Sequence, residues 1–504
     1  MATKILSAAL LGLDAEIVSV EADAGGGDFG KISIVGLPDT SVSEARERVR
    51  SALRNCGHPY PQRKITVNLA PASLKKHGSA YDLPIAVAIL ALKNNFTFDF
   101  TKAILAGELS LNGDVKAIKG ALSLAAKVAR LGLKNLYLPA ENAVEAKLIK
   151  NINVYPVQTL SGLVSHFLKK KLISAAPETN INIRSTDCAF DLSDIKGQAQ
   201  AKRALEIAAA GAHNLILCGP PGAGKTLLAR TMPSLLPKLS LPEILEITKI
   251  YSAAGKLASG QGLINQRPFR APHHSATTNA LIGGGALPRP GEISLAHRGV
   301  LFLDELTEFS GAVLENLRQP LETGQIIIDR SAHSLKFPAR FLLLGAMNPC
   351  ACGYLGDAKQ KCLCTPAKIL NYHRRLSGPW LDRIDMRITV ARLAWSQLNN
   401  ETPPETSAQV RVRVEMARVK QNQRFAGTNY LTNADLPGHD LKKYCPLSAA
   451  AENLLAAAAD RLGLSARACH RVIKLARTIA DLAGLNEIQA DQLAEAIQYH
   501  PRLE

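Results

Sequence analysis

Residues 214–230 read NLILCGPPGAGKTLLAR, and this segment identifies the kind of sheet around which a large part of the chain folds. A short apolar run enters a loop of the pattern G-x-x-x-x-G-K-T, and a helix-forming run follows. In such a loop, glycines let successive backbone N–H groups converge on phosphate oxygens at a helix N-terminus. Lys225 would reach the β- and γ-phosphates, and Thr226 would hold Mg²⁺. The segment therefore predicts an ATP site made of Gly219, Pro220, Pro221, Gly222, Ala223, Gly224, Lys225, Thr226 and Leu227.

Two further apolar segments carry polar side chains at the ends of predicted strands. GVLFLDELTEF (299–309) contains Asp304 and Glu305, and ARFLLLGAMNP (339–349) contains Asn348. The carboxyl ends of parallel strands meet at one edge of a sheet, so these groups are expected beside the loop. Asp304 would order the Mg²⁺ shell, Glu305 would polarise the attacking water, and Asn348 would orient that water or sense the γ-phosphate. The alternatives are a solvated strand end for the acids and a turn residue for the asparagine.

The order of apolar segments predicts an α/β protein with three parts. Residues 191–395 repeat strand–loop–helix units, which suit a parallel sheet. Residues 1–168 also alternate strand-like and helix-like stretches, and residues 169–190 lose periodicity and are predicted as a linker. Residues 396–504 are rich in Ala, Leu and Arg at helical spacing and are predicted to be all-helical. Within the first part, the predicted elements are strands at 65–72 and 102–111 and helices at 82–93 and 121–132.

Composition limits the classes of protein to which the chain can belong. It has 504 residues, 47% hydrophobic and 20% charged, which is typical of a globular chain and excludes wholesale disorder. The chain has no run of 18 apolar residues, and its N-terminus is predicted as a strand rather than a signal peptide, so we expect a cytoplasmic protein. The net charge of +17 suits a polyanionic partner such as nucleic acid, although an ordinary basic protein is the alternative.

Four of the nine cysteines are bunched in the pattern C-x-C-x₉-C-x-C, and the odd total fits a reducing compartment. Two close pairs separated by a short loop can converge as a tetrahedral thiolate site for zinc. The spacing departs from the commoner C-x-x-C, so a redox pair or incidental cysteines are the alternatives. We predict a structural zinc site formed by Cys350, Cys352, Cys362 and Cys364.

The order of these motifs resembles that of an AAA+ ATPase. Four segments resemble the magnesium-chelatase-like group, and with the N-terminal region the match is to its ComM/YifB branch, over essentially the whole chain. The resemblance implies a central AAA+ domain at 191–395, a four-cysteine insert at 350–364 and a helical lid at 396–504. The four segments are RPFRAPHHSATTNALIGGG (267–285), GEISLAHRGVLFLDE (291–305), LRQPLETGQIIIDR (317–330) and RRLSGPWLDRID (374–385).

Two elements resemble parts that face DNA in related ring motors. The insert between the two nucleotide motifs would face a central pore, with a loop packed on the core as the alternative. QIIIDRSAHSLKFPA (325–339) predicts a hairpin where the group carries a pre-sensor hairpin, and a purely structural hairpin is the alternative. The candidate nucleic-acid residues are Arg267, Arg270, His273 and His274 of the insert and Arg330, His333 and Lys336 of the hairpin.

The resemblance also implies two arginines that act on the nucleotide. Arg383 matches the position of an arginine finger for the neighbouring subunit, and an internal salt bridge to Asp382 or Asp385 is the alternative. Arg467 matches the sensor arginine of the lid, on a helix predicted at 465–482. Weaker candidates for these roles are Arg374, Arg375, Arg471, Lys474 and Arg477.

Residues 1–168 resemble the domain of Lon-type proteases, through KHGSAYDLPIAVAIL (76–90) and AGELSLNGDVKAIKGALSLAA (106–126). Active members pair a nucleophilic serine with a lysine. The motifs put Asp82 and Leu124 at these positions, and Ser79 could be nominated only by a local shift, so we expect no proteolysis. Assembly or DNA binding is expected instead, through basic residues such as Arg46, Arg48, Arg50, Lys75 and Lys76.

The resemblance implies an ATP-driven hexameric DNA motor, a branch-migration helicase in natural transformation and homologous recombination. ATP, Mg²⁺ and structural Zn²⁺ would be its cofactors. Its partners would be single-stranded and branched DNA, other copies of the chain in a homo-hexamer and a recombinase, with no membrane. The alternatives are a chelatase-type motor subunit, which would need neither the N-terminal domain nor the four cysteines, and an ATP-dependent protein remodeller.

Overall fold

The computed structural model divides into two compact units. It describes residues 3–25, 31–58, 63–94, 96–178, 189–257, 262–285, 288–329, 334–357, 359–393 and 404–500. The first unit comprises Met1–Ile183, Ser240–Ile264 and Leu287–Pro290, and the second comprises Arg184–Leu239, Asn265–Ala286 and Gly291–Glu504. Two predicted nucleic-acid residues, Arg330 and His333, lie outside the described residues.

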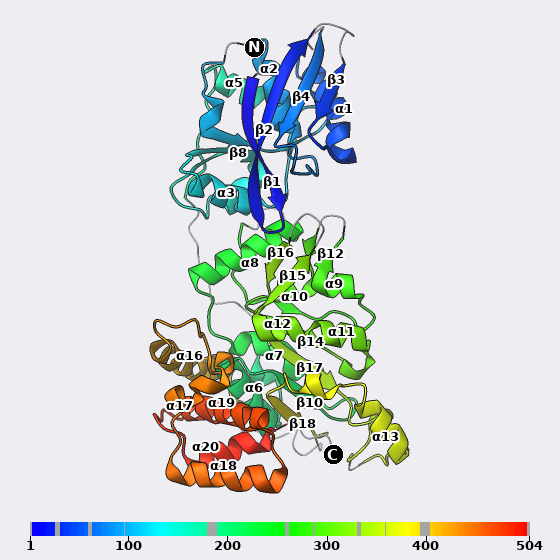
Figure 1. Cartoon of the computed structure of the whole chain (residues 1–504), viewed down its shortest axis with the longest axis vertical. Helices are drawn as coiled ribbons and strands as arrows, with labels where there is room; N and C mark the ends of the chain where they lie inside the picture. Colours follow the sequence, from blue (N-terminus) through cyan, green and yellow to red (C-terminus); the bar gives the residue numbers. More distant parts are fainter. Residues whose placement is uncertain are drawn as a thin grey trace. The chain divides into compact units, whose positions relative to one another are not determined.

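The first unit is built on a mixed seven-stranded sheet (Figure 1). Its central hairpin turns at Gly12, whose φ of 63° favours glycine. Along the second strand, Val18, Val20 and Ala22 are buried and alternate with more exposed residues, the two-residue period of a strand with one covered face. The strands of this unit are β1 (Thr3–Leu11), β2 (Asp14–Gly25), β3 (Ile32–Val35), β4 (Lys64–Ala70), β5 (Ala103–Leu105), β6 (Glu108–Leu109), β7 (Val115–Lys116), β8 (Asn135–Pro139), β9 (Asn153–Val157) and β13 (Arg289–Pro290). The order in the large sheet is β3-β4-β2-β1-β5-β8-β9.

Among the helices of the first unit, α1 (Thr40–Asn55) buries one stripe of residues, whereas α2 (Asp82–Ala91) is buried almost all round. The first helix begins at Asp39, whose side chain accepts a hydrogen bond from the backbone N–H of Val42. The predicted helices at 82–93 and 121–132 are confirmed, whereas the predicted strand at 102–111 is broken at Gly107, which bonds to the backbone of Ala80 and Leu83. The helices are α1 (Thr40–Asn55), α2 (Asp82–Ala91), α3 (Ala121–Arg130), α4 (Ala143–Ala146), α5 (Leu160–Phe167) and α8 (Leu241–Ala254).

The second unit contains a five-stranded sheet in which every pair is parallel, as the strand–loop–helix pattern predicts. The strands that carry the predicted nucleotide motifs are wholly buried runs, which is typical of parallel strands covered on both faces. The five strands are β10 (Leu215–Cys218), β11 (Phe269–Arg270), β14 (Val300–Leu303), β17 (Leu342–Met347) and β18 (Met386–Thr389), in the order β11-β14-β17-β10-β18. The short strand β12 (Gly283–Gly284) and an antiparallel hairpin of β15 (Gln325–Asp329) and β16 (Ser334–Pro338) complete the strands of this unit.

The C-terminal helices share one hydrophobic core with the helices beside this sheet. Val414 and Leu475 from the C-terminal region lie in the same buried cluster as Leu205 and Leu228 near the sheet. Figure 1 draws the C-terminal helices in brown to red. Within 404–500 the structure contains helices and no strand, as predicted. The helices of the unit are α6 (Ala199–Gly211), α7 (Lys225–Leu235), α9 (Thr278–Ile282), α10 (Glu292–Leu295), α11 (Gly311–Asn316), α12 (Arg318–Thr323), α13 (Pro366–His373), α14 (Gly378–Leu381), α16 (Ser407–Arg424), α17 (Leu441–Tyr444), α18 (Ala449–Leu462), α19 (Ala466–Leu482) and α20 (Ala490–Gln498).

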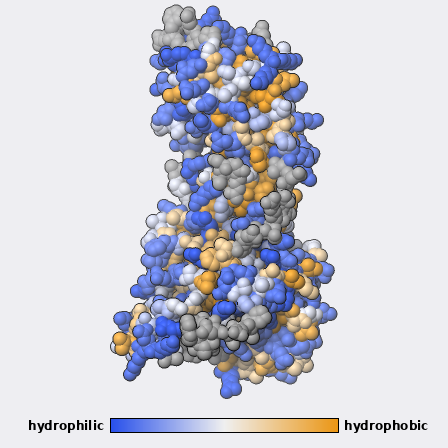
Figure 2. Space-filling view, turned by 180° about the vertical axis from the view of Figure 1, so that it is seen from behind, coloured by the Kyte–Doolittle hydropathy of each residue, from blue (hydrophilic) through white to orange (hydrophobic). Residues whose placement is uncertain are grey.

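The face of the molecule seen in Figure 2 is mostly polar. Figure 2 shows hydrophilic residues over most of the face in view, with smaller groups of hydrophobic residues among them. Among the described helices, none has the length and apolar character needed to cross a membrane.

Candidate functional site

The loop that follows β10 has the backbone geometry of a phosphate cradle. Gly222 and Gly224 have φ of 76° and 89°, and a Cβ at either position would meet nothing within 4 Å. These two glycines therefore permit the left-handed turns and leave space open over the loop. Gly219 is required for a different reason, because a Cβ there would lie 2.2 Å from the carbonyl oxygen of Val390. The loop ends at Lys225, the first residue of α7, so the N-terminus of that helix faces the open space.

The ammonium group of Lys225 connects the loop to the neighbouring strand. Its Nζ donates to the carbonyl oxygens of Gly219 at 2.6 Å and Pro220 at 2.9 Å, and to Oδ1 of Asn348 at 3.1 Å. Burial lowers the pKa of Lys225, although the nearby Cys218 and Asp304 oppose this effect. The structure thus brings together Lys225 and Asn348, and the ammonium is held by oxygen atoms of the kind that a phosphate would supply.

Hard oxygen ligands lie at the adjacent strand end. The hydroxyl of Thr226 donates to Oδ2 of Asp304 at 2.9 Å, and Oδ1 of Asp304 accepts from the backbone N–H of Glu305 at 3.0 Å. A hydroxyl oxygen and a carboxylate oxygen that lie in contact are metal ligands of the kind that suits Mg²⁺ bound to a nucleotide. The loop and these two side chains therefore fit ATP with Mg²⁺.

Glu305 points toward the insert between the nucleotide motifs. Its backbone lies in the left-handed region, with φ 51° and ψ 46°, and its side chain is 60% exposed. Its Oε2 lies 3.1 Å from Nδ1 of His274, and the ring of His273 lies against that of His274 with centroids 4.1 Å apart. His273 itself is exposed, and its Nδ1 lies 2.7 Å from the hydroxyl of Ser275. Of the two predicted nucleic-acid histidines in the insert, His274 thus contacts the predicted general base.

The two arginines at the start of the insert are engaged by the protein itself. Arg267 donates from Nε to the carbonyl oxygen of Pro237 at 2.5 Å and from Nη1 to that of Arg298 at 2.7 Å. Arg270 pairs with Glu292 at 2.5 Å. These contacts fix the backbone that leads into the insert.

The hairpin of β15 and β16 is present as predicted. Lys336 is exposed and lies directly opposite Ile327 in the antiparallel register. The tip, residues 330–333, lies outside the described residues. Of the three hairpin candidates, the structure therefore describes only Lys336.

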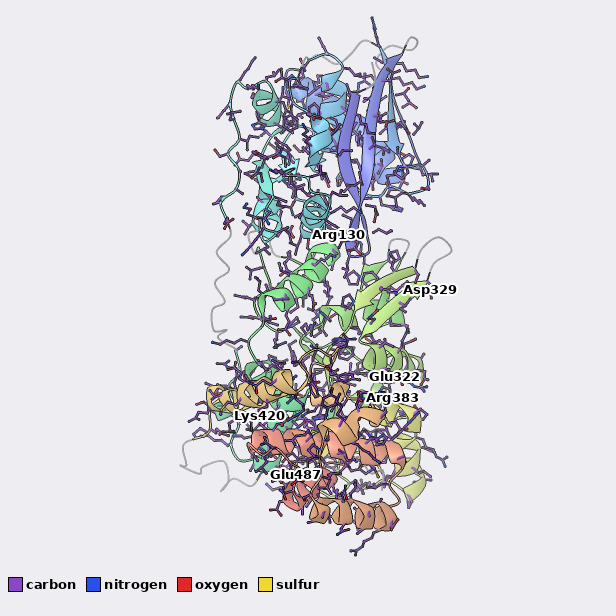
Figure 3. All side chains as sticks on the ribbon, turned by 60° about the vertical axis from the view of Figure 1, so that its left-hand side comes forward. Arg130, Glu322, Asp329, Arg383, Lys420 and Glu487 are labelled. Atoms are coloured by element: carbon purple, nitrogen blue, oxygen red, sulfur yellow. The ribbon has the colours of Figure 1, made fainter. Side chains whose placement is uncertain are left out.

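Arg383 is paired with a carboxylate that sequence reasoning missed. Its guanidinium forms an ion pair with Glu322, at the end of α12, and Nη1 donates to the carbonyl oxygen of Pro379 at 3.1 Å (Figure 3). Burial lowers the pKa of Arg383, and the positive charges of Arg318 and Arg467 add to this effect. The carboxylate of this ion pair therefore comes from Glu322 and not from Asp382 or Asp385, which are nearer in the sequence.

Arginines of α19 reach the backbone around Arg383. Arg471 donates to the carbonyl oxygens of Leu381 at 3.1 Å and Ile384 at 3.3 Å and to Asp382 at 3.3 Å. Arg467 is 74% exposed, with Nη1 3.9 Å from Asp382. Helix α19 thus holds the loop of Arg383, while Arg467 is mostly exposed to solvent.

The remaining basic candidates have structural contacts or an exposed position. Arg477 is fully buried and pairs with Asp481 at 2.9 Å, and Lys474 donates to the carbonyl oxygen of Ala434 at 3.0 Å. Arg375 pairs with Glu308 at 3.0 Å, and Arg374 is exposed.

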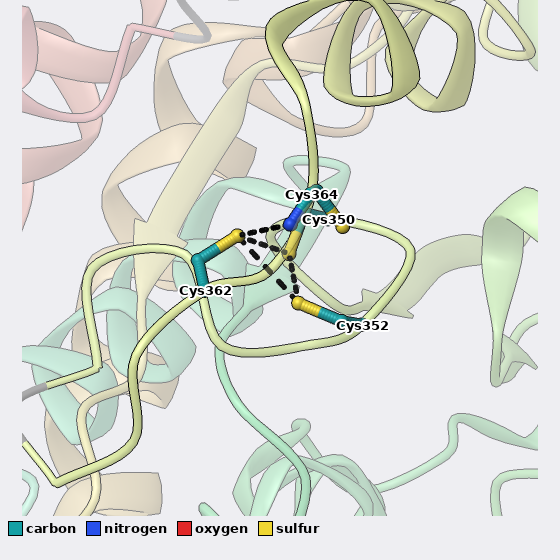
Figure 4. Close-up of side chains that lie close together, drawn as sticks. All are labelled: Cys350, Cys352, Cys362 and Cys364. Atoms are coloured by element: carbon teal, nitrogen blue, oxygen red, sulfur yellow. Dashed lines mark hydrogen bonds between the residues drawn. The ribbon is translucent and has the colours of Figure 1, made fainter.

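The four bunched cysteines converge, as Figure 4 shows. Their Sγ atoms all lie within 4.8 Å of one another. Individual separations are 3.3 Å for Cys350–Cys352, 3.5 Å for Cys352–Cys362 and 3.7 Å for Cys350–Cys362, and all four cysteines, Cys364 included, are free thiols. Four sulfurs around tetrahedral zinc, at Zn–S of about 2.3 Å, lie about 3.8 Å apart, so the cluster fits this ion. Hydrogen bonds from the backbone N–H groups of Tyr354 and Leu363 lower the pKa of Cys352 to about 6, whereas burial and the neighbouring cysteines raise the pKa of Cys362 and Cys364.

In the first unit, the position resembling a protease nucleophile is occupied by a buried ion pair. Asp82 has a fully buried side chain and accepts from Nε of Arg48 at 2.7 Å and from its Nη2 at 3.0 Å. Burial raises the pKa of Asp82, against the effect of Arg48. Leu124 is buried in a separate apolar cluster, and the hydroxyl of Ser79 donates to Glu108. From these contacts, we assign Arg48 and Asp82 a structural role in this region.

Comparison with known protein families finds matches over three segments. The model described as magnesium chelatase, subunit ChlI, matches residues 191–398, and that of subunit ChlI of Mg-chelatase matches residues 20–142. The model of the ChlI C-terminal region matches residues 404–500.

Individual relatives match nearly the whole chain. Competence protein ComM of Haemophilus influenzae is 43% identical over 503 residues, covering 98% of this chain and 96% of that protein. The uncharacterized protein YifB of Escherichia coli is 44% identical over 494 residues, covering 97% and 95% respectively. The magnesium-chelatase 38 kDa subunit of Cereibacter sphaeroides is 26% identical over 192 residues, which cover 32% of this chain and 53% of that subunit.

Proposed function

Because the chain belongs to the ComM/YifB family of magnesium-chelatase-like AAA+ ATPases, we propose that it is an ATP-driven hexameric DNA motor. Its proposed activity is branch migration of paired DNA strands in natural transformation and homologous recombination. The observation that carries the ATPase part is the convergence of Lys225, Asn348, Thr226 and Asp304 at one edge of the parallel sheet. The relative named competence protein ComM supports the DNA part.

Each residue of this edge has a task that its position suits. Bound ATP with Mg²⁺ supplies the γ-phosphoryl group and the charge that polarises it. Lys225, now bonded to backbone carbonyl oxygens, would bind oxygens of the β- and γ-phosphates, and Thr226 with Asp304 would hold Mg²⁺. Glu305 accepts the proton of the attacking water, and Asn348 orients that water.

Two arginines would complete the site from a neighbouring subunit and from the lid. Arg383 lies on a loop fixed by Arg471 of α19, and its side chain is 16% exposed, so it would have to leave its partner Glu322 before it could contact a phosphate. An arginine that acts in trans explains why a ring is proposed. Arg467, exposed on the lid helix, would sense the nucleotide.

DNA would contact the exposed basic and polar side chains of the insert and hairpin. His273 and Lys336 are exposed, and the chain carries a net charge of +17. Phosphate contacts of this kind need no base recognition. Cys350, Cys352, Cys362 and Cys364 would hold a structural Zn²⁺ directly after the strand that carries Asn348.

The first unit is proposed to serve assembly or DNA binding rather than proteolysis. Arg48 is engaged with the buried Asp82, so the remaining candidates for a basic surface are the exposed Arg46, Arg50 and Lys75. Lys76 is buried and donates to the carbonyl oxygen of Pro71, which removes it from such a surface.

The proposal is tested by ATP turnover with and without single-stranded and forked DNA, with Lys225→Ala as the blank. We expect DNA to raise turnover severalfold, and the blank to lack turnover under both conditions. Turnover that is indifferent to DNA contradicts a DNA motor and leaves protein remodelling as the next activity to test. A chelatase role has less support, since the match to the magnesium-chelatase subunit covers only 32% of the chain.

A further inference from the structure

The strand at the start of the insert, β11, leads the chain toward the proposed general base. β11 pairs in parallel with β14, with Phe269 opposite Val300 and Arg270 opposite Leu301. Because parallel strands deliver their carboxyl ends to the same edge, the chain leaving β11 reaches the edge where β14 is followed by Asp304 and Glu305. The stacked rings of Phe269 and Phe302, 5.8 Å between centroids, fix this register from the side chains as well.

His274 faces Glu305 from this segment. The separation of 3.1 Å between Nδ1 and Oε2 is a hydrogen-bond distance. An ionised carboxylate only accepts, so Nδ1 must carry the proton in this contact. The neighbouring ring of His273, tilted by 34° and 4.1 Å away, limits the orientations open to the His274 ring.

The chain is held by the fold before His273 and His274 and is more exposed after them. Arg270 is paired with Glu292, and β11 is part of the sheet, so the chain is fixed immediately before the histidines. Beyond them, Ser275, Thr277 and Asn279 are all exposed, and Ala276 and Thr278 between them are half-buried. His274 therefore stands where an anchored strand passes into an exposed insert.

Glu305 needs such a contact to have a defined position. It is exposed, and its backbone adopts a left-handed conformation that non-glycine residues keep only where neighbours hold them. A general base must lie within hydrogen-bond reach of the proton that it accepts. With Oε2 engaged by His274, Oε1 is left for water.

We propose that His274 is a positioning residue that holds the carboxylate of Glu305 ready for the attacking water. This proposal rests on the proposed ATPase function, and it assigns to His274 a role in hydrolysis rather than in DNA contact. It predicts that the residue acts through Glu305 and not through nucleotide affinity.

The test compares three substitutions of His274 in the full chain, by steady-state ATP turnover without DNA. His274→Ala is expected to lower kcat about tenfold, a part of the contribution of a general base, with KM and the affinity for a fluorescent ATP analogue unchanged. His274→Asn is expected to restore most of kcat, because its amide N–H takes the place of Nδ1–H. His274→Gln carries its amide one bond further out and is expected to restore little. His439→Ala, at an exposed histidine of the lid, is the matched control and is expected to retain full turnover.

A double variant shows whether His274 acts through Glu305. In a Glu305→Gln background, His274→Ala is expected to have no further effect on the residual turnover, because interacting residues are not additive. An additive tenfold loss, or a single His274→Ala variant with kcat within twofold of wild type, overturns the proposal. If the alanine variant fails to fold, equal turnover in the Asn and Gln variants overturns it instead. Because every measurement is made without DNA, a wild type whose turnover ignores DNA refutes the motor and leaves this result standing.

Discussion

Removal of the arginine that neutralises Asp82 is expected to destabilise the first unit locally and strongly. The Asp82 side chain is fully buried, and Arg48 approaches it with two nitrogens, at 2.7 and 3.0 Å. Arg48→Ala leaves a buried carboxylate without its cation, which typically costs about 3–5 kcal/mol. Because the Arg48 side chain is itself 21% exposed, we expect the lower end, about 3 kcal/mol.

Hydrogen–deuterium exchange of the full chain measures this cost where it arises. Amides of α1 and α2 should exchange roughly a hundredfold faster in Arg48→Ala, since about 1.4 kcal/mol corresponds to a factor of ten. The matched control is Arg46→Ala on the same helix. Its ion pair with Glu47 spans 3.6 Å between side chains that are 58% and 69% exposed, so less than about 0.5 kcal/mol is expected.

The pH dependence of this cost has a definite sign. Burial raises the pKa of Asp82 in the folded state, and loss of Arg48 raises it further. An acid whose folded pKa is raised binds protons more readily when folded, so the stability of the variant rises as pH falls through that pKa. The difference between Arg48→Ala and wild type should therefore shrink on acidification. Exchange of α1 and α2 within threefold of wild type at neutral pH refutes the reasoning, as does a difference that grows with acidity.

Three further predictions concern the second unit. Glu322→Gln removes the carboxylate that competes with a phosphate for Arg383. Because that carboxylate is 51% exposed and screened by solvent, we expect the pair to contribute up to about 1 kcal/mol, so turnover of the assembled protein should rise by up to about fivefold. Arg383→Ala should abolish turnover, and a fall of turnover in Glu322→Gln contradicts release of Arg383 from Glu322 during the reaction. Purified protein should contain one zinc per chain by elemental analysis. Cys362→Ser should lose the zinc and Cys469→Ser should keep it, and acid should release the metal because it protonates the thiolates. Equal zinc in both variants refutes the four-cysteine site. Lys336→Ala should weaken binding to single-stranded DNA a few fold and flatten its salt dependence, and an unchanged salt slope in fluorescence anisotropy removes Lys336 from the DNA surface.

The parallel sheet and the nucleotide edge could be predicted because their signals are local. The loop at 219–226 is a contiguous motif, and Asp304 and Asn348 each follow a buried strand whose direction fixes where they lie. The lid helix at 466–482 and the hairpin at 325–338 also follow from periodicity within one segment. Contacts with distant segments have little influence on where these elements form.

Contacts between distant segments could not be predicted. β11 has only two residues, too few for a periodic signal, so nothing in the sequence placed His274 beside Glu305 rather than on a DNA-facing surface. The pairing of Arg383 with Glu322 depends on the packing of α12 beside the loop that carries the arginine, and nearer acids in the sequence were the obvious partners. The strand expected at 102–111 breaks because Gly107 bonds to the backbone before α2, a contact without a local pattern.

The central claim is that ATP hydrolysis at this edge of the sheet moves DNA branches. The most direct measurement follows a synthetic four-way junction with labelled arms, incubated with the full chain, ATP and Mg²⁺, beside Lys225→Ala and Glu305→Gln variants. We expect the wild type to convert the junction to two duplexes only with hydrolysable ATP, and neither variant to do so. Binding of the junction without conversion, alongside intact ATP turnover, would contradict it.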